Sequence, residues 1–193
     1  EGGAADGGGG GNLWNDSMAN LTNVKIIGGY AQNGGGIANH GSVIMKGCTV
    51  TNNEAAGKGA GIYFNSYTDG RDLSLNGNNT ITENTGWGGC AGVYVDAASK
   101  GNFVLQDTPV IKGNRDYYDP HHNLYLEGDK KIRISDKLTA EAAVYLSMQS
   151  VNGIFTVDFN KTDSKDVFHG ENKEEITEVF ADPDSESGAT ELH

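Results

Sequence analysis

The sequence has little proline, little cysteine and no long apolar run. With 3 prolines and 2 cysteines among 193 residues, it is neither a proline-rich linker nor a disulfide-rich scaffold. Its 29 glycines follow no three-residue period, which excludes collagen. No apolar stretch approaches the roughly 20 residues of a membrane-spanning helix, so we expect no membrane insertion.

Basic residues are also scarce, and this limits the partners. The chain has 14 Lys and Arg against 26 Asp and Glu, a formal net charge of −12. Proteins that bind nucleic acids or anionic membranes need basic patches, so we expect no nucleic-acid partner. An acidic surface is compatible with cations, basic partners or neutral glycans.

The two cysteines, Cys48 and Cys90, have no metal-ligand spacing. They could pair in an oxidising compartment or both remain free, and we favour free thiols. The chain begins at Glu1 without a methionine, so we expect a trimmed part of a larger, secreted surface protein.

Short apolar stretches recur along the chain in three sets, with steps of 24 to 31 residues. Each stretch alternates apolar and polar residues over three to five positions, which is typical of a strand with one buried face. Gly, Asn and Asp fill the gaps and favour turns. The first set is centred on Ile37, Ile62, Val93 and Leu124, the second on Met45, Leu75, Leu105 and Ile134, and the third on Ile26, Val50, Ile81 and Ile111.

This repetition predicts an all-β fold, a right-handed parallel β-helix with three short strands per coil. Each strand would pair with its equivalent in the next coil, because a single coil cannot bury its own apolar face. The right hand follows from the preference of parallel crossovers. Asn53, Asn84 and Asn114 follow the third set at equal offset, so we expect them to hydrogen-bond along the stack.

We divide the chain into a Gly-rich segment at 1–20, the β-helix at 21–160, and a C-terminal cap with an acidic tail at 161–193. In the last part of the β-helix, Val144 is expected to join the first set, and residues 153–159 to form a strand. Val167 and Phe168 are the expected packing anchors of the cap. Residues 174–180 have spacing for a short helix or an edge strand.

Three motifs carry a family resemblance: Gly-Gly-Gly-Ile at 34–37, Thr-Val-Thr-Asn-Asn at 49–53 and Gly-Ala-Gly-Ile-Tyr at 59–63. They resemble the pectate-lyase-like β-helix repeats of bacterial surface proteins, including polymorphic outer-membrane proteins and Gram-positive adhesins. The resemblance covers about residues 21–160. It implies an adhesion or display module that is extracellular, at the cell surface or secreted. Several enzyme families share this fold, so the resemblance leaves activity open.

If the first set points inward, the next residue of each strand points outward. This places Tyr63, Tyr94 and Tyr125 in one outer column, together with Ala38 and Tyr145. A parallel outer column contains His40, Asn65, Asp96, Glu127 and Ser147. Tyrosine rings can stack on sugars and the polar groups can bind their hydroxyls, which indicates a glycan-binding face. The alternative is that stacked tyrosines only stabilise the coils or lie beneath a loop.

The same acids permit an enzymatic interpretation. Asp96 and Glu127 would lie about one coil apart, near the roughly 5 Å separation of a retaining glycosidase pair. No Arg or Lys falls in these two columns to complete such a site. The two acids could instead be solvated, or could hold calcium.

Two loops carry further candidates. Asp116, Asp119, His121 and His122 crowd one loop, which could ligate a metal but is more typical of a solvated turn. Trp87 lies between glycines and is either an exposed binding aromatic or a lid over a coil edge.

These observations predict a non-catalytic, adhesin-like surface module that binds a host or environmental glycan or a surface protein. One alternative is a carbohydrate-active enzyme, a polysaccharide lyase or glycoside hydrolase, that uses Asp96 and Glu127. Another is a purely structural stalk. No resident cofactor is expected, calcium apart.

Overall fold

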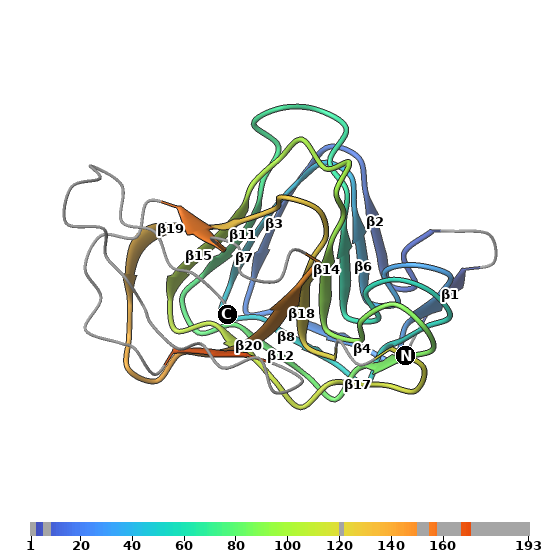
Figure 1. The fold of residues 1–193 in the computed structure, drawn as a ribbon. Helices are drawn as coiled ribbons and strands as arrows, with labels where there is room; N and C mark the ends of the chain where they lie inside the picture. Colours follow the sequence, from blue (N-terminus) through green and yellow to red (C-terminus); the bar gives the residue numbers. More distant parts are fainter. Residues whose placement is uncertain (1–2, 6–8, 120–121, 150–154, 158–166, 171–193) are drawn as a thin grey trace.

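The computed structural model describes residues 3–5, 9–119, 122–149, 155–157 and 167–170. Within these ranges the protein is all-β, with parallel strands in curled sheets and no helix. The described part therefore has no helix that could cross a membrane. Viewed nearly along the stack, successive repeats superpose around a common interior (Figure 1). This architecture is consistent with a parallel β-solenoid.

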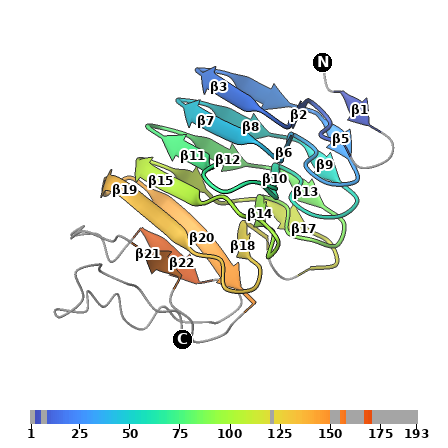
Figure 2. The same ribbon diagram turned by 90° about the horizontal axis from the view of Figure 1, so that it is seen from above.

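The strands form sets in which each strand pairs in parallel with its equivalent in the next repeat (Figure 2). The expected alignments of all three sets are confirmed by the strand register. The first set comprises β2 (Leu13–Asn15), β6 (Ile37–Asn39), β10 (Ile62–Phe64), β14 (Val93–Val95) and β18 (Leu124–Leu126). The second comprises β3 (Met18–Thr22), β7 (Ser42–Lys46), β11 (Leu73–Asn76), β15 (Phe103–Asp107), β19 (Ile132–Leu138) and β21 (Thr156–Val157). The third comprises β4 (Lys25–Ile27), β8 (Thr49–Thr51), β12 (Thr80–Thr82) and β16 (Val110–Ile111).

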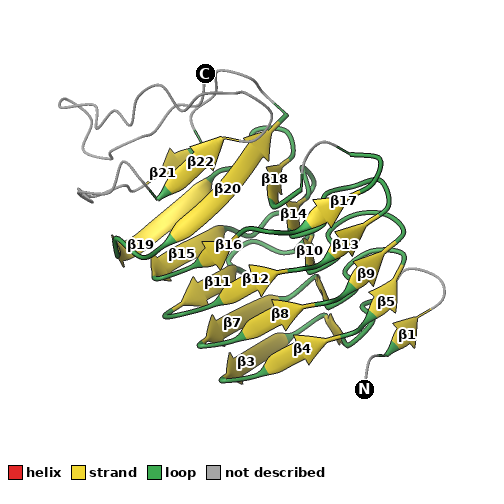
Figure 3. Ribbon diagram, turned by 90° about the horizontal axis from the view of Figure 1, so that it is seen from below, coloured by secondary structure: helices red, strands yellow, loops and turns green. Residues whose placement is uncertain are grey.

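A fourth set was not expected, so the prediction of three strands per coil is not confirmed. It comprises β1 (Ala4–Ala5), β5 (Tyr30–Ala31), β9 (Glu54–Ala55), β13 (Thr85–Gly86) and β17 (Arg115–Asp116). Figure 3 shows these strands beside the third set. Each has two residues, which is too short to show the apolar alternation that identifies a strand in a sequence.

The interior is a stack of apolar layers. Ile37, Ile62, Val93 and Leu124 are fully buried, which confirms the inward direction assigned to the first set. They pack with inward residues of the second and third sets, including Leu75 and Ile81, in one continuous core. The hydrophobic effect therefore acts between coils, and each coil depends on its neighbours for burial.

The predicted asparagine ladder is confirmed and is longer than expected. The side-chain nitrogen Nδ2 of Asn53 donates to Oδ1 of Asn84 at 2.9 Å, and that of Asn84 donates to Asn114 at 2.8 Å. Asn12 and Asn123 extend the ladder at its two ends, with distances of 3.0 and 2.9 Å. Each central amide also bonds to backbone atoms, so a buried polar column is satisfied within the fold.

The register changes at β20 (Ala143–Met148), where the prediction for Val144 is wrong. Val144 pairs with Ile111 of the third set, whereas Leu146 pairs with Leu124 of the first. The strand β20 thus pairs with both the third set and the first set, and no fourth-set strand lies between its two paired parts. The next strand, β22 (Phe168–Gly170), pairs with β20.

The chain ends differ in part from the expected division. The boundary at residue 20 falls inside β3, and β2 already pairs in register with β6. Val167 and Phe168 are buried, as expected of packing anchors. Of the strand expected at 153–159, the structure describes β21; residues 174–180 and the acidic tail lie outside the described residues. Both cysteines are buried thiols outside any disulfide, as favoured.

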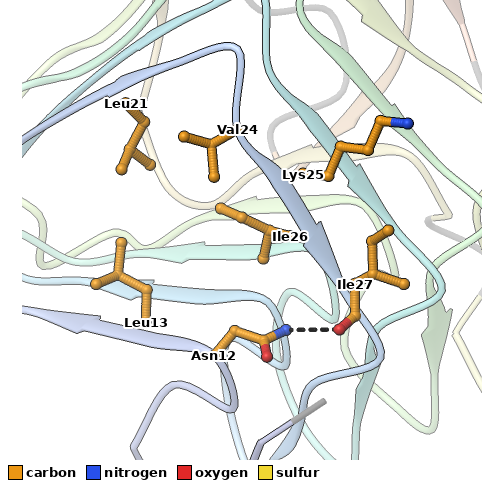
Figure 4. A pocket seen from close by; sticks show the side chains of 7 residues that line it. All are labelled: Asn12, Leu13, Leu21, Val24, Lys25, Ile26 and Ile27. Carbon is orange, nitrogen blue, oxygen red and sulfur yellow. Dashed lines mark hydrogen bonds between the residues drawn. The ribbon is translucent and has the colours of Figure 1, made fainter. Parts of the chain in front are cut away.

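A hollow of about 390 Å³ lies at the N-terminal end of the stack (Figure 4). Leu13, Leu21, Val24 and Ile26 line it with apolar side chains. These residues occupy positions that the preceding coil covers elsewhere in the stack. The hollow is therefore the end of the core, and none of the predicted site residues lines it.

Candidate functional site

The tyrosine column lies on the outer side of the first set, as predicted. We use this name for Tyr63, Tyr94 and Tyr125, which are aligned by direct strand pairing. They point outward because the flanking apolar residues of each strand point into the core. Ala38 also occupies the column, and Trp14 precedes it. Ser147, not Tyr145, pairs with Tyr125, so the expected places of both residues are wrong by two positions.

Tyr63 and Tyr94 of the tyrosine column are covered although they point outward, and Tyr125 is half-buried. Tyr63 is only 8% exposed and Tyr94 only 5%. Neighbouring rings pack with centroids 6.2 Å apart for Tyr63 and Tyr94, and 5.2 Å apart for Tyr94 and Tyr125. The buried Cys90 packs against them from the loop before β14. The central rings therefore present little open face to a sugar.

The polar column lies beside the tyrosines. The backbone N–H of Asp96 donates to Phe64 at 3.0 Å, and that of Glu127 donates to Val95 at 3.0 Å, so Asn65, Asp96 and Glu127 follow their strands in register. The backbone N–H of Gln149 donates to Leu126, so Gln149 takes the next place in the polar column. Ser147 was expected to fill that place.

Lys58 joins the two acids, and sequence reasoning missed it. Its ammonium Nζ lies 3.0 Å from Oδ2 of Asp96 and 3.3 Å from Oε2 of Glu127. The same nitrogen lies 4.5 Å from the centroid of the Tyr94 ring. Lys58 comes from the loop before β10, outside both columns, so strand alignment carried no signal for it. Lys58 directly precedes Gly59, whose positive φ of 63° turns the chain into the strand.

A tyrosine hydroxyl and a side-chain amide complete this network as donors. The hydroxyl of Tyr63 donates to Oδ2 of Asp96 at 2.8 Å, and Asn65 Nδ2 donates to that hydroxyl at 3.2 Å. Burial and the bond to Asp96 raise the pKa of Tyr63 above its usual value of 10. Burial and a hydrogen bond to Glu127 likewise raise the pKa of Tyr94.

The same contacts keep Asp96 ionised. Burial alone would raise its pKa, but the backbone N–H of Ala98, the Lys58 ammonium and the Tyr63 hydroxyl together lower the pKa below 3.8. A general acid for glycoside hydrolysis needs the opposite shift. The ammonium also lies between the two carboxylates where a calcium ion would need to bind, so these residues fit calcium poorly. The arrangement is that of a structural ion pair.

The open part of this face lies next to Tyr63. The ring of His40 stacks on that of Tyr67 at 4.6 Å and 10°, and Trp14 packs on His40 at 4.6 Å. Trp14 is 44% exposed and Tyr67 is 60% exposed. His40 Nδ1 lies 2.8 Å from the carbonyl of Asn65, and because a carbonyl only accepts, Nδ1 carries a proton. We call Trp14, His40 and Tyr67 the aromatic end of the column.

The loop with Asp116 and the histidines is organised by backbone contacts. Oδ1 of Asp116 accepts the N–H groups of Tyr118 and Asp119, and Nδ1 of His122 accepts the N–H of Asp116. His121 lies outside the described residues. Among the described residues, no group of three His, Cys, Asp or Glu side chains could hold a metal ion. Trp87 is exposed and stacks on Tyr117.

Comparison with protein-family models, curated proteins and solved structures gave no match. The resemblance to pectate-lyase-like surface repeats therefore depends on the sequence pattern alone.

Proposed function

We propose that this chain is a non-catalytic β-helix module of a larger bacterial surface protein, extracellular and at the cell surface or secreted, that binds neutral glycans. We infer a right-handed coil from the preference of parallel crossovers. Three main strand sets would then define each coil, with the fourth set as a corner. The motifs at 34–37, 49–53 and 59–63, which resemble repeats of surface proteins, support this location. The acidic composition is compatible with a neutral glycan as the partner.

The observation that carries the glycan proposal is the aromatic end. Trp14 and Tyr67 present exposed rings on either side of His40, next to the covered Tyr63. Flat aromatic faces with polar edges suit stacking on the apolar faces of sugar rings. The indole N–H of Trp14 bonds to Asp16 at 2.6 Å, which orients the ring. Tyr63 links this end to the tyrosine column, because its ring packs on His40 with centroids 5.9 Å apart and its hydroxyl bonds to Asn65 and Asp96.

The enzyme alternative has less support. Asp96 and Glu127 share one ammonium, and Asp96 is held as a carboxylate, so neither a proton donor nor a free nucleophile stands out. The enzyme alternative would require that the chain releases reducing ends from polysaccharides and that Glu127→Gln abolishes this release. A purely structural stalk is the alternative if no ligand binds.

A glycan array tests the proposal, followed by titration of the best ligand. Trp14→Ala and Tyr67→Ala should each weaken binding by about 2- to 13-fold, from the roughly 0.5–1.5 kcal/mol of one aromatic contact. Tyr30→Ala is the matched control, since Tyr30 is also exposed but lies in β5 of the fourth set. A silent array, or equal loss with the control, refutes the glycan-binding proposal.

A further inference from the structure

A second aromatic surface lies on the loops that follow the fourth set of strands. Trp87 follows β13 and Tyr117 follows β17, so they occupy equivalent places in adjacent coils. Their rings stack with centroids 4.6 Å apart and planes 23° apart, close to the about 4.8 Å spacing of paired strands. Trp87 is 41% exposed and Tyr117 is 49% exposed. We call this pair the Trp87–Tyr117 stack.

The backbone holds the stack in place. The N–H of Trp87 donates to Ala55 at 3.1 Å, and the N–H of Tyr117 donates to Gly86 at 3.1 Å, which continues the strand pairing into the loops. Both ring-bearing positions are therefore anchored to the coil below. A ligand would meet rings that are already aligned, which lowers the entropy cost of binding.

Asp116 ties the two loops together from inside. It is buried, and its Oδ2 accepts the N–H groups of Gly88 and Gly89 at 3.1 Å each. A Cβ on Gly86 would lie 2.0 Å from the same oxygen, so only glycine leaves room for this carboxylate. The loop that carries Trp87 is thus held by hydrogen bonds to a buried side chain.

Arg115 adds a positive charge to the stack. The carbon Cζ of its guanidinium lies 4.5 Å from the centroid of the Tyr117 ring. The side chain is exposed, and it forms no ion pair with any of the described residues. Other exposed basic side chains, such as Lys112, also have no ion-pair partner among the described residues; Arg115 differs from Lys112 in its place against the Tyr117 ring. A guanidinium presents its N–H groups as a planar fork that matches a carboxylate.

We propose that Trp87, Tyr117 and Arg115 form a binding site for a saccharide that carries a carboxylate. The rings supply stacking surface for the sugar, and the guanidinium donates hydrogen bonds to the carboxylate. This site uses a different face and a different ligand class from the aromatic end, and it stands independently of the function proposed there.

The test is titration calorimetry of the full chain with trigalacturonate, with lactose as the neutral probe. The affinity for trigalacturonate should fall with added salt, and the affinity for lactose should not. Arg115→Gln should weaken trigalacturonate binding about tenfold or more and leave lactose unchanged. Trp87→Ala should weaken it by about 2- to 13-fold. Arg115→Lys keeps the charge without the fork and should give an intermediate loss.

Tyr30→Ala is the matched control, since Tyr30 is an exposed aromatic residue of the same fourth set, in β5, and lies outside both proposed sites. It should leave trigalacturonate affinity within twofold. Thermal melting of each variant shows that the coils remain folded. The proposal is overturned if trigalacturonate does not bind at millimolar concentration, if Arg115→Gln and Trp87→Ala leave its affinity unchanged, or if Arg115→Gln weakens lactose binding as much as trigalacturonate binding.

Discussion

Lys58→Met gives the sharpest test of the ion network on the outer face. The variant keeps an unbranched apolar stem over Tyr94 but removes the ammonium that Asp96 and Glu127 share. An exposed ion pair contributes about 0–1 kcal/mol, and breaking a fully buried pair costs about 3–5 kcal/mol. The Lys58 side chain is 36% exposed and those of its partners 12% and 24%, so this network lies between these limits.

We therefore expect the free energy of unfolding to fall by about 2 kcal/mol at neutral pH. For a chain of this size, that corresponds to a melting temperature lower by about 4–8 °C. Urea denaturation and thermal melting both measure the difference. Lys112→Met is the control, because Lys112 is exposed and forms no ion pair among the described residues, and it should stay within about 0.5 kcal/mol of wild type.

The dependence on pH separates an ionic effect from lost packing. The pKa of Asp96 is lowered in the folded state, so its contribution is fully present above its unfolded value and is lost as pH falls through the folded value. The difference in free energy of unfolding between wild type and Lys58→Met should be constant from about pH 5 to 8. It should shrink as the pH falls below about 4. A variant as stable as Lys112→Met at neutral pH, or a difference that persists in acid, refutes the ionic account.

Three further outcomes are expected. Asn84→Ala breaks the asparagine ladder and leaves buried groups unpaired, so it should cost about 3 kcal/mol by urea denaturation; a loss no larger than that of the exposed Asn78→Ala contradicts this. Because the tyrosine column has raised pKa values, its hydroxyls stay protonated in the folded state, and stability should fall as pH rises above 10; absorbance titration showing all 8 tyrosines ionising together at their ordinary pKa argues against it. Both cysteines are buried, so thiol reagents should label them only as the chain unfolds, and rapid labelling of the native protein speaks against the packing described.

Much of the fold could be predicted because it repeats. Apolar alternation in three sets identified the strands, their pairing and the inward direction of residues such as Ile62 and Val93. The fourth set could not be found in this way, because β9 and β13 have two residues each and are held by backbone hydrogen bonds. Val144 was misplaced because the repeat period changes at β20, where the fourth-set corner is absent.

The candidate site was predictable only as far as the strands reach. The outward column of Tyr63 and Tyr94 follows from strand parity, and the structure places it as expected. Its burial does not follow from parity, because covering groups such as Cys90 come from loops. The contacts of Lys58 span 38 and 69 residues along the chain, and no local pattern encodes such distances.

The corner after the first set has a practical consequence. The chain passes from β6 to β7 through only His40 and Gly41, whereas the equivalent passage from β10 to β11 contains a longer loop in which residues 67–70 are all exposed. The strands on both sides nevertheless keep the same register. Gly70 has open space around it, because a Cβ at this position would have no neighbouring atom within 4 Å. This corner is therefore a natural place to graft a foreign peptide, and the solenoid would carry it as a fixed-spacing display scaffold.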